Sequence, residues 1–121
     1  MARILVVDDS PIETRQFASA LANEGHDVIA ALNGSEGIEL ANAEQPDLIL
    51  MDVVMPGING FQATRQLTRD RATAHIPVII VSTKGLPADR VWGERQGAVG
   101  YLTKPVDNRL LIKTVNDTLA R

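Results

Sequence analysis

Five short apolar runs recur along the chain, and each is followed by a longer segment of amphipathic character. The runs are residues 4–7, 28–31, 48–51, 78–81 and 100–102. Each run is almost continuously hydrophobic instead of alternating, which is typical of strands covered on both faces, as in a parallel sheet with helices above and below it. Buried helix fragments are the alternative interpretation of such short runs. The regular alternation favours a doubly wound α/β sheet of five parallel strands with five helices.

The residues that precede the amphipathic segments support their assignment as helices. Ser10 supplies a cap and Pro11 occupies the first helical position, while Asn33 and Asp107 can cap two further helices. We expect the helices at about residues 11–23, 34–43, 60–70, 86–96 and 107–119.

The length and the apolar pattern predict one domain and no membrane segment. A chain of 121 residues is large enough for one core and too small for two, so we expect a single domain over residues 1–121 with no separate output domain. The apolar run at residues 4–7 is too short for a signal peptide. No uninterrupted apolar stretch approaches the ~20 residues that a membrane-spanning helix needs.

The charge and the cysteine content restrict the classes of partner and the compartment. A formal net charge of -3 gives no broad basic field, which argues against direct binding of nucleic acid and leaves proteins as the expected partners. The chain has no cysteine, which removes disulfides and thiolate metal sites and fits a reducing compartment. We therefore expect a cytoplasmic protein.

Polar side chains follow four of the five apolar runs, at the ends where a doubly wound sheet binds its ligands. Asp8 and Asp9 follow the first run, Asp52 the third, Ser82 to Lys84 the fourth, and Lys104 with Pro105 the fifth. An isolated aspartate in such a place is usually a cap or turn residue, and an isolated lysine is usually a solvated surface charge. The convergence of four loops favours a functional site instead.

The three aspartates and the lysine together indicate phosphoryl chemistry at a metal. Two carboxylates about 5 Å apart at an effective dielectric constant near 20 repel by roughly 3 kcal/mol, so such a cluster requires a cation. Oxygen ligands of high charge favour a hard ion such as Mg²⁺. Asp52 directly follows a hydrophobic strand and is the natural nucleophile, and Lys104 can supply an ammonium group for the oxygens of the transferred group.

Four segments of the chain resemble the CheY-type receiver family. They are residues 4–10 (ILVVDDS), 50–60 (LMDVVMPGING), 77–82 (PVIIVS) and 97–105 (GAVGYLTKP), and the likeness extends from end to end. This resemblance implies a flavodoxin-like sheet with the strand order 2-1-3-4-5.

The resemblance also assigns roles to the polar residues. It implies that Asp52 is the phosphoacceptor and that Asp9, Asp52 and the backbone carbonyl of Val54 hold Mg²⁺, with help from Asp8 through water. Lys104 would contact the phosphoryl oxygens. We accordingly expect a protein that catalyses only its own Mg²⁺-dependent phosphorylation and dephosphorylation, and not a turnover enzyme.

Further residues match the switch of that family. Ser82 matches the hydroxyl that moves toward the phosphoryl group, and Tyr101 matches the aromatic residue that changes orientation with it. Family members usually carry a cis peptide before the proline that corresponds to Pro105. Outside this set, Trp92 has two interpretations, ordinary partial burial or a contact surface for a protein partner.

At a finer level, residues 60–68 and 91–98 resemble the stand-alone regulators of pilus-based twitching motility. That likeness implies a histidine kinase of the CheA type as the phosphoryl donor and a motility or signalling protein downstream. We expect the protein itself to be a monomer.

Two other functions compete with this interpretation. A Mg²⁺-dependent phosphohydrolase with an aspartyl nucleophile would need an acid/base aspartate two residues after Asp52, and that place holds Val54. A phosphorylation-independent scaffold of the same fold would not need the complete set of Asp8, Asp9, Asp52, Ser82 and Lys104.

Overall fold

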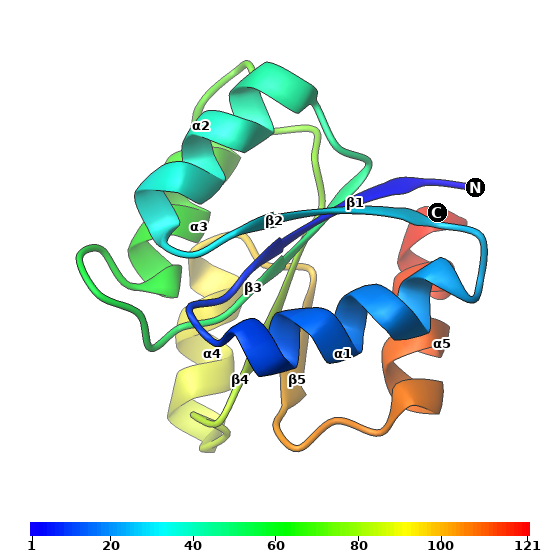
Figure 1. Cartoon of the computed structure of the whole chain (residues 1–121). Helices are drawn as coiled ribbons and strands as arrows, with labels where there is room; N and C mark the ends of the chain where they lie inside the picture. The colour runs from blue at the N-terminus through cyan, green and yellow to red at the C-terminus, as the bar shows by residue number, and fades with distance from the viewer.

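Five parallel strands form one sheet in the order β2-β1-β3-β4-β5, which confirms the predicted topology (Figure 1). The computed structural model describes all 121 residues. The strands are β1 (Arg3–Val7), β2 (Asp27–Ala31), β3 (Leu48–Met51), β4 (Val78–Ser82) and β5 (Gly100–Thr103). Each contains the apolar run that predicted it, extended by no more than one residue at an end.

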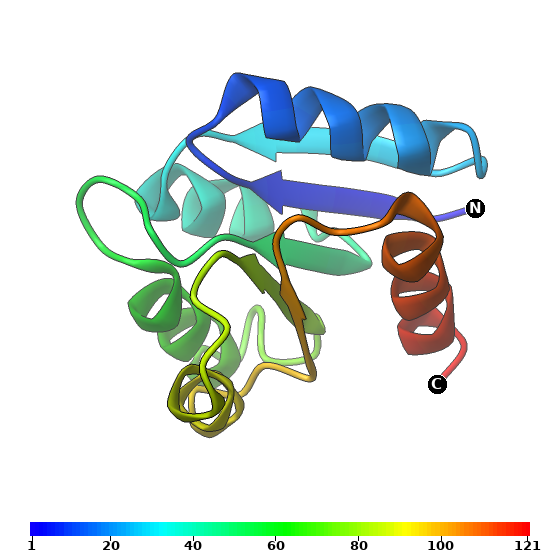
Figure 2. The same ribbon diagram turned by 90° about the horizontal axis from the view of Figure 1, so that it is seen from below.

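Five helices alternate with the strands and cover both faces of the sheet (Figure 2). They are α1 (Pro11–Ala22), α2 (Gly34–Glu44), α3 (Gly60–Arg69), α4 (Pro87–Arg95) and α5 (Asn108–Leu119). Their boundaries agree with the predicted ones to within one residue. No helix combines the length and the hydrophobicity that a membrane span requires.

The helix boundaries have local causes that are visible in the hydrogen bonds. The side chains of Ser10, Asn33 and Asp107 each accept a hydrogen bond from a backbone N–H in the first turn of α1, α2 and α5, as predicted. Helix α3 has a reciprocal cap that the sequence analysis did not identify, in which Asn59 accepts from the N–H of Gln62 at 2.9 Å and the Gln62 side chain accepts from the N–H of Asn59 at 2.8 Å. Such caps typically contribute about 1 kcal/mol each.

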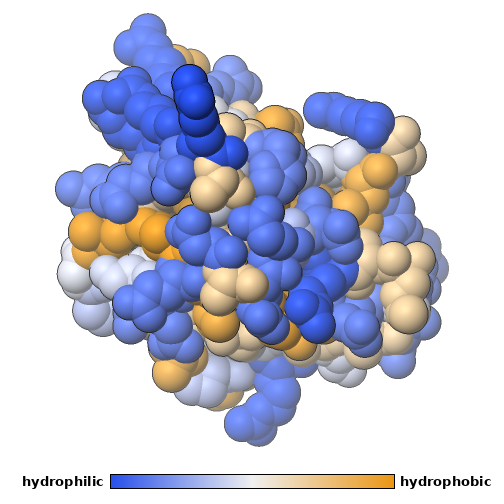
Figure 3. Space-filling model, turned by 90° about the horizontal axis from the view of Figure 1, so that it is seen from above, coloured by the Kyte–Doolittle hydropathy of each residue, from blue (hydrophilic) through white to orange (hydrophobic).

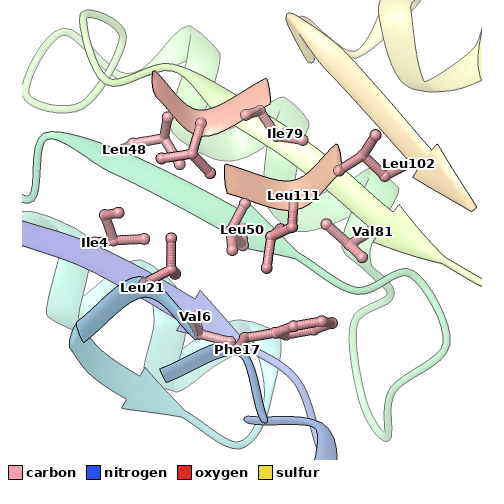
Figure 4. Close-up of a cluster of buried hydrophobic side chains, with 11 residues drawn as sticks. Ile4, Val6, Phe17, Leu21, Leu48, Leu50, Ile79, Val81, Leu102 and Leu111 are labelled. Atoms are coloured by element: carbon pink, nitrogen blue, oxygen red, sulfur yellow. The ribbon is translucent and has the colours of Figure 1, made fainter. Parts of the chain in front are cut away.

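The core consists of two main layers, one on each face of the sheet. Ile4 and Val6 of β1 face a cluster shared with α1 and α5 (Figure 4), while Leu5 and Val7 face a cluster shared with α2 and α3. Neighbouring residues of one strand are therefore both buried, which is why the strands are continuously hydrophobic in sequence. On the side of the molecule where α2 lies, hydrophobic groups are interspersed among hydrophilic ones (Figure 3).

The strand register brings the polar residues to one edge of the sheet, which we call the carboxyl edge. Val7 pairs with Met51, so the residues that follow them, Asp8 and Asp52, leave the sheet side by side. Ser82 at the end of β4 pairs with Thr103, directly before Lys104. A parallel sheet thus turns positions that are distant in sequence into neighbours.

Candidate functional site

The three predicted aspartates meet at the carboxyl edge. Carboxylate oxygens of Asp8, Asp9 and Asp52 lie within 4.8 Å of one another, with Asp8 and Asp52 buried and Asp9 exposed. The backbone anchors this arrangement, because the N–H of Asp52 donates to the carbonyl of Val7 at 2.9 Å. The structure therefore confirms that these residues come together.

Lys104 is the cation that contacts this cluster. Its ammonium Nζ lies 2.8 Å from Oδ2 of Asp8 and 3.6 Å from Oδ2 of Asp52, and only 8% of its side chain is exposed. The same Nζ also donates to the carboxylate of Glu13, in the first turn of α1. Glu13 was not predicted from the sequence, where its only signal is its place three residues after the cap Ser10.

The β5–α5 connection holds Lys104 in place. The Lys104–Pro105 peptide is cis, as predicted. The backbone N–H of Lys104 donates to the carbonyl of Ser82 at 2.9 Å, so the lysine is attached to the end of β4 as well as to the end of its own strand.

The segment after Asp52 folds back, so that Gly60 packs against the backbone of Asp52 and Val53. The N–H of Val53 donates to Oδ1 of Asp52 at 2.8 Å, and the N–H of Gly60 donates to the carbonyl of Val53 at 2.9 Å. A Cβ at Gly60 would lie 1.9 Å from the carbonyl oxygen of Asp52, so only glycine fits there. Val54 lies in this segment with an exposed side chain, and the role of its carbonyl as a metal ligand stays a prediction.

The two predicted switch residues both form a hydrogen bond with the backbone of Lys84. The hydroxyl of Ser82, which is fully buried, accepts from the N–H of Lys84 at 3.3 Å. The hydroxyl of Tyr101 donates to the carbonyl of Lys84. The backbone of Lys84 thus links the strand end at Ser82 to the aromatic ring on β5.

Arg90 of α4 is a second residue that sequence reasoning missed. Its guanidinium donates to the carbonyl of Tyr101 at 3.2 Å and to Oγ1 of Thr103 at 2.9 Å. It also lies 5.4 Å from the centroid of the Tyr101 ring, a cation–π distance. Burial raises the pKa of the Tyr101 hydroxyl, as does the charge of Asp89, while Arg90 opposes the shift.

Trp92 lies on the exposed flank of α4, with 47% of its surface accessible. The next residue, Gly93, faces the sheet, where an added Cβ would lie 2.9 Å from Cδ1 of Ile80. Other large exposed apolar side chains occur on or beside α4, β5 and α5, namely Leu86, Val91, Val99 and Leu110. Trp92 is thus half exposed, and its contact with a partner stays a prediction.

Comparison with known proteins identifies the family to which this chain belongs. The family model described as the response regulator receiver domain matches residues 4–116. The chain is a response regulator receiver.

The receiver resembles relatives and solved structures over nearly its whole length. It is 60% identical over 120 residues to Protein PilH of Pseudomonas aeruginosa, and the match covers 99% of each chain. Its structure superposes on CheY4 of Vibrio cholerae with a TM-score of 0.91 at 30% identity, covering 97% of this chain and 98% of that one. A putative response regulator from Chloroflexus aurantiacus gives a TM-score of 0.95 at 28% identity, covering 99% and 98%. These matches confirm the family and fold predicted from the sequence.

The electrostatics of the receiver site are dominated by burial and by unequal charge. Burial raises the pKa of Asp52, the Lys104 charge lowers it, Asp8 raises it, and the net direction is upward. Burial lowers the pKa of Lys104, but its hydrogen bonds to Asp8 and Glu13 and the charge of Asp52 outweigh that effect, so the pKa of Lys104 is raised. The pKa of Asp52 is thus raised chiefly by burial, whereas the pKa of Lys104 is raised by the carboxylates around its ammonium group.

The donor set fits a hard divalent cation. Asp8, Asp9 and Asp52 offer only oxygen ligands, and their carboxylates are close enough to share one ion. One lysine does not balance them, because Lys104 also bonds Glu13. A receiver with these residues has both the ligands and an electrostatic reason to bind Mg²⁺.

We predict that Asp52→Asn stabilises the metal-free protein by about 1–2 kcal/mol, because it removes one of three repelling carboxylates. The folded-state pKa of Asp52 is raised, so the wild type loses free energy of unfolding as pH rises through that pKa and Asp52 becomes charged. The advantage of Asp52→Asn should therefore shrink in acid, where the wild-type Asp52 is protonated. Thermal melts at several pH values measure this difference.

Added Mg²⁺ should raise the melting temperature of the wild type in the same experiment. Asp117→Asn, which removes a carboxylate on the exposed surface of α5, is the control and should melt with the wild type. If neither Mg²⁺ nor the substitution Asp52→Asn increases the melting temperature, repulsion among the aspartates is not a feature of this site.

Proposed function

We propose that this response regulator accepts a phosphoryl group on Asp52 from a phosphohistidine of a histidine kinase. The observation that carries the proposal is the placement of the Asp52 carboxylate, which is buried beside two further aspartates and has the Lys104 ammonium 3.6 Å away. A nucleophilic carboxylate with cationic support is what phosphoryl transfer requires, because charge on the phosphoryl oxygens must be neutralised.

The transfer exchanges one bond to phosphorus for another. An oxygen of Asp52 attacks the phosphorus atom, the N–P bond of the phosphohistidine breaks, and its electron pair stays on the imidazole nitrogen. Lys104 lies close enough to pair with the oxygens of the new acyl phosphate. Asp9, Asp52 and the carbonyl of Val54 would hold Mg²⁺, with Asp8 acting through water, and the ion would supply positive charge to those oxygens.

The hydrogen bonds around Lys84 support a route from the phosphoryl group to the surface. The Ser82 hydroxyl gains a charge-assisted partner only when Asp52 is phosphorylated, and a move toward it would loosen its bond from the N–H of Lys84. The carbonyl of the same residue accepts from Tyr101, so a displaced Lys84 backbone would free the ring to reorient. Trp92 and its apolar neighbours are the surface that this motion would alter for a partner.

The two competing functions find less support. The place where an aspartyl phosphohydrolase would need its acid/base aspartate is occupied by Val54, whose side chain is 58% exposed. A scaffold that works without phosphorylation would not require two buried aspartates beside a nearly buried lysine. Burying these charges costs desolvation energy.

The likeness to PilH supports a role in pilus-based twitching motility or chemotaxis-like signalling. The match covers 99% of each of the two chains. A kinase of the CheA type would donate the phosphoryl group, and a motility or signalling protein would be the target. The protein would act as a monomer in the cytoplasm.

We predict that an acyl phosphate donor with Mg²⁺ adds one base-labile phosphoryl group to the wild type, because an aspartyl phosphate is a mixed anhydride. Intact mass measurement detects the adduct. Asp52→Ala should show none, whereas Asp9→Asn, which keeps the nucleophile, should react more slowly. Retention of the adduct in Asp52→Ala would place the phosphoacceptor elsewhere.

Ser82→Ala should still accept the phosphoryl group but should transmit little change to the surface. Loss of one charge-assisted hydrogen bond, about 1.5–3 kcal/mol, shifts a two-state balance by about ten- to a hundredfold. Trp92 fluorescence and amide exchange over residues 82–105, before and after phosphorylation, measure the response.

Thr83→Ala is the matched control for this variant, because Thr83 directly follows Ser82 and also carries a hydroxyl but is exposed. It should respond as the wild type does. A full response in the phosphorylated Ser82→Ala protein would show that the signal travels by another residue.

A further inference from the structure

Glu13 takes one of the hydrogen bonds of the Lys104 ammonium. An ammonium group has three N–H donors. In this structure Nζ bonds the carboxylates of Asp8, at 2.8 Å, and Glu13, while Asp52 at 3.6 Å lies beyond hydrogen-bond distance. The lysine is thus directed toward Asp8 and Glu13, and it reaches Asp52 through its charge alone.

The two residues that hold Lys104 differ in how easily they release it. The side chain of Asp8 is 3% exposed, whereas that of Glu13 is 35% exposed. A carboxylate that loses its partner inside the protein incurs a large desolvation cost, but one that is already partly hydrated does not. Glu13 is therefore the partner that Lys104 can exchange for another anion.

Phosphorylation would place such an anion beside the lysine. Before it, the carboxylates of Asp8, Glu13 and Asp52 lie around one ammonium group. A further carboxylate, that of Asp9, lies beside those of Asp8 and Asp52. A phosphoryl group carries about -1.5 to -2 charges at pH 7, more than the carboxylate that it modifies. Glu13 is then a like charge next to the phosphoryl oxygens and a competitor for the same ammonium.

We propose that Glu13 is a positioning residue that holds Lys104 away from Asp52 and thereby slows phosphorylation and lowers the phosphorylated fraction. This inference rests on the proposed function, because it takes Asp52 as the phosphoacceptor. The opposite role, in which Glu13 orients Lys104 productively for transfer, predicts a slower reaction when Glu13 is changed. The sign of one measurement separates the two.

The test compares Glu13→Gln with the wild type in phosphorylation by acetyl phosphate and Mg²⁺. In this step the Asp52 Oδ–P bond forms and the donor P–O bond breaks, with the electron pair leaving on acetate. Gln keeps the length of the side chain and removes its charge. We expect the rate constant to rise about three- to tenfold, as for loss of a partly exposed charge pair, together with a larger phosphorylated fraction.

The same measurement at increasing salt separates charge from structure. Because Glu13 is partly exposed, salt should screen its effect and reduce the difference between Glu13→Gln and the wild type. Glu13→Asp, which keeps the charge, should stay near the wild-type rate, and Glu13→Ala should behave like Glu13→Gln.

Glu36→Gln is the matched control, because Glu36 occupies the same position in α2 that Glu13 occupies in α1. Each donates its backbone N–H to the side chain of the helix cap, Asn33 and Ser10 respectively. Glu36→Gln should leave the rate unchanged.

A measurement that does not depend on phosphorylation reports on Lys104 directly. The side-chain ammonium resonance of Lys104 in the metal-free protein should shift in Glu13→Gln and not in Glu36→Gln. If the wild type takes no phosphoryl group, the proposed function fails. If the wild type reacts but Glu13→Gln reacts at the same rate or more slowly, or if its advantage survives high salt, only the role of Glu13 is overturned.

Discussion

The contact between the Lys104 ammonium and three carboxylates joins the parts of this receiver that carry its function. Asp8 comes from the end of β1, Asp52 from the end of β3 and Glu13 from the first turn of α1, while the lysine follows β5. The lysine and the two aspartates are almost completely removed from water. Such an arrangement is favourable only when the charges are paired, so a change of charge at Asp52 must alter the contacts of Lys104.

The fold positions the charged residues, and the neighbouring hydrogen bonds connect them to the protein surface. Two apolar layers fix the register of β1, β3 and β4, and this register sets Asp52 beside Asp8. Beyond the charged cluster, Ser82 and Tyr101 both form a hydrogen bond with the backbone of Lys84, and Arg90 links α4 to β5. The sheet thus positions the charged residues, and the hydrogen bonds of Ser82, Tyr101 and Arg90 connect them to α4 and the surface.

The sequence predicted the features that depend on strand period and on position after a strand. Continuous apolar runs indicated buried parallel strands, and the polar residues directly behind them indicated Asp8, Asp52 and Lys104. Glu13 and Arg90 escaped notice because both are helical residues with no distinctive pattern. The hydrogen-bond partner of such a side chain depends on its rotamer and on how the helix packs. Neither can be predicted from the local sequence. The bonds of Ser82 and Tyr101 to Lys84 were hidden for a related reason, because their partner is backbone in a loop.

The stability of Lys104→Met in metal-free solution tests the importance of this contact most directly. Met keeps much of the length of the side chain and removes the ammonium group, which leaves the carboxylates facing one another. The account predicts that the free energy of unfolding falls by about 2–4 kcal/mol and that much of the loss is recovered by Mg²⁺ or by a second change, Asp52→Asn. Lys113→Met, on the exposed surface of α5, should melt near the wild type. A Lys104→Met protein as stable as the wild type, or one that neither Mg²⁺ nor Asp52→Asn rescues, would contradict the account.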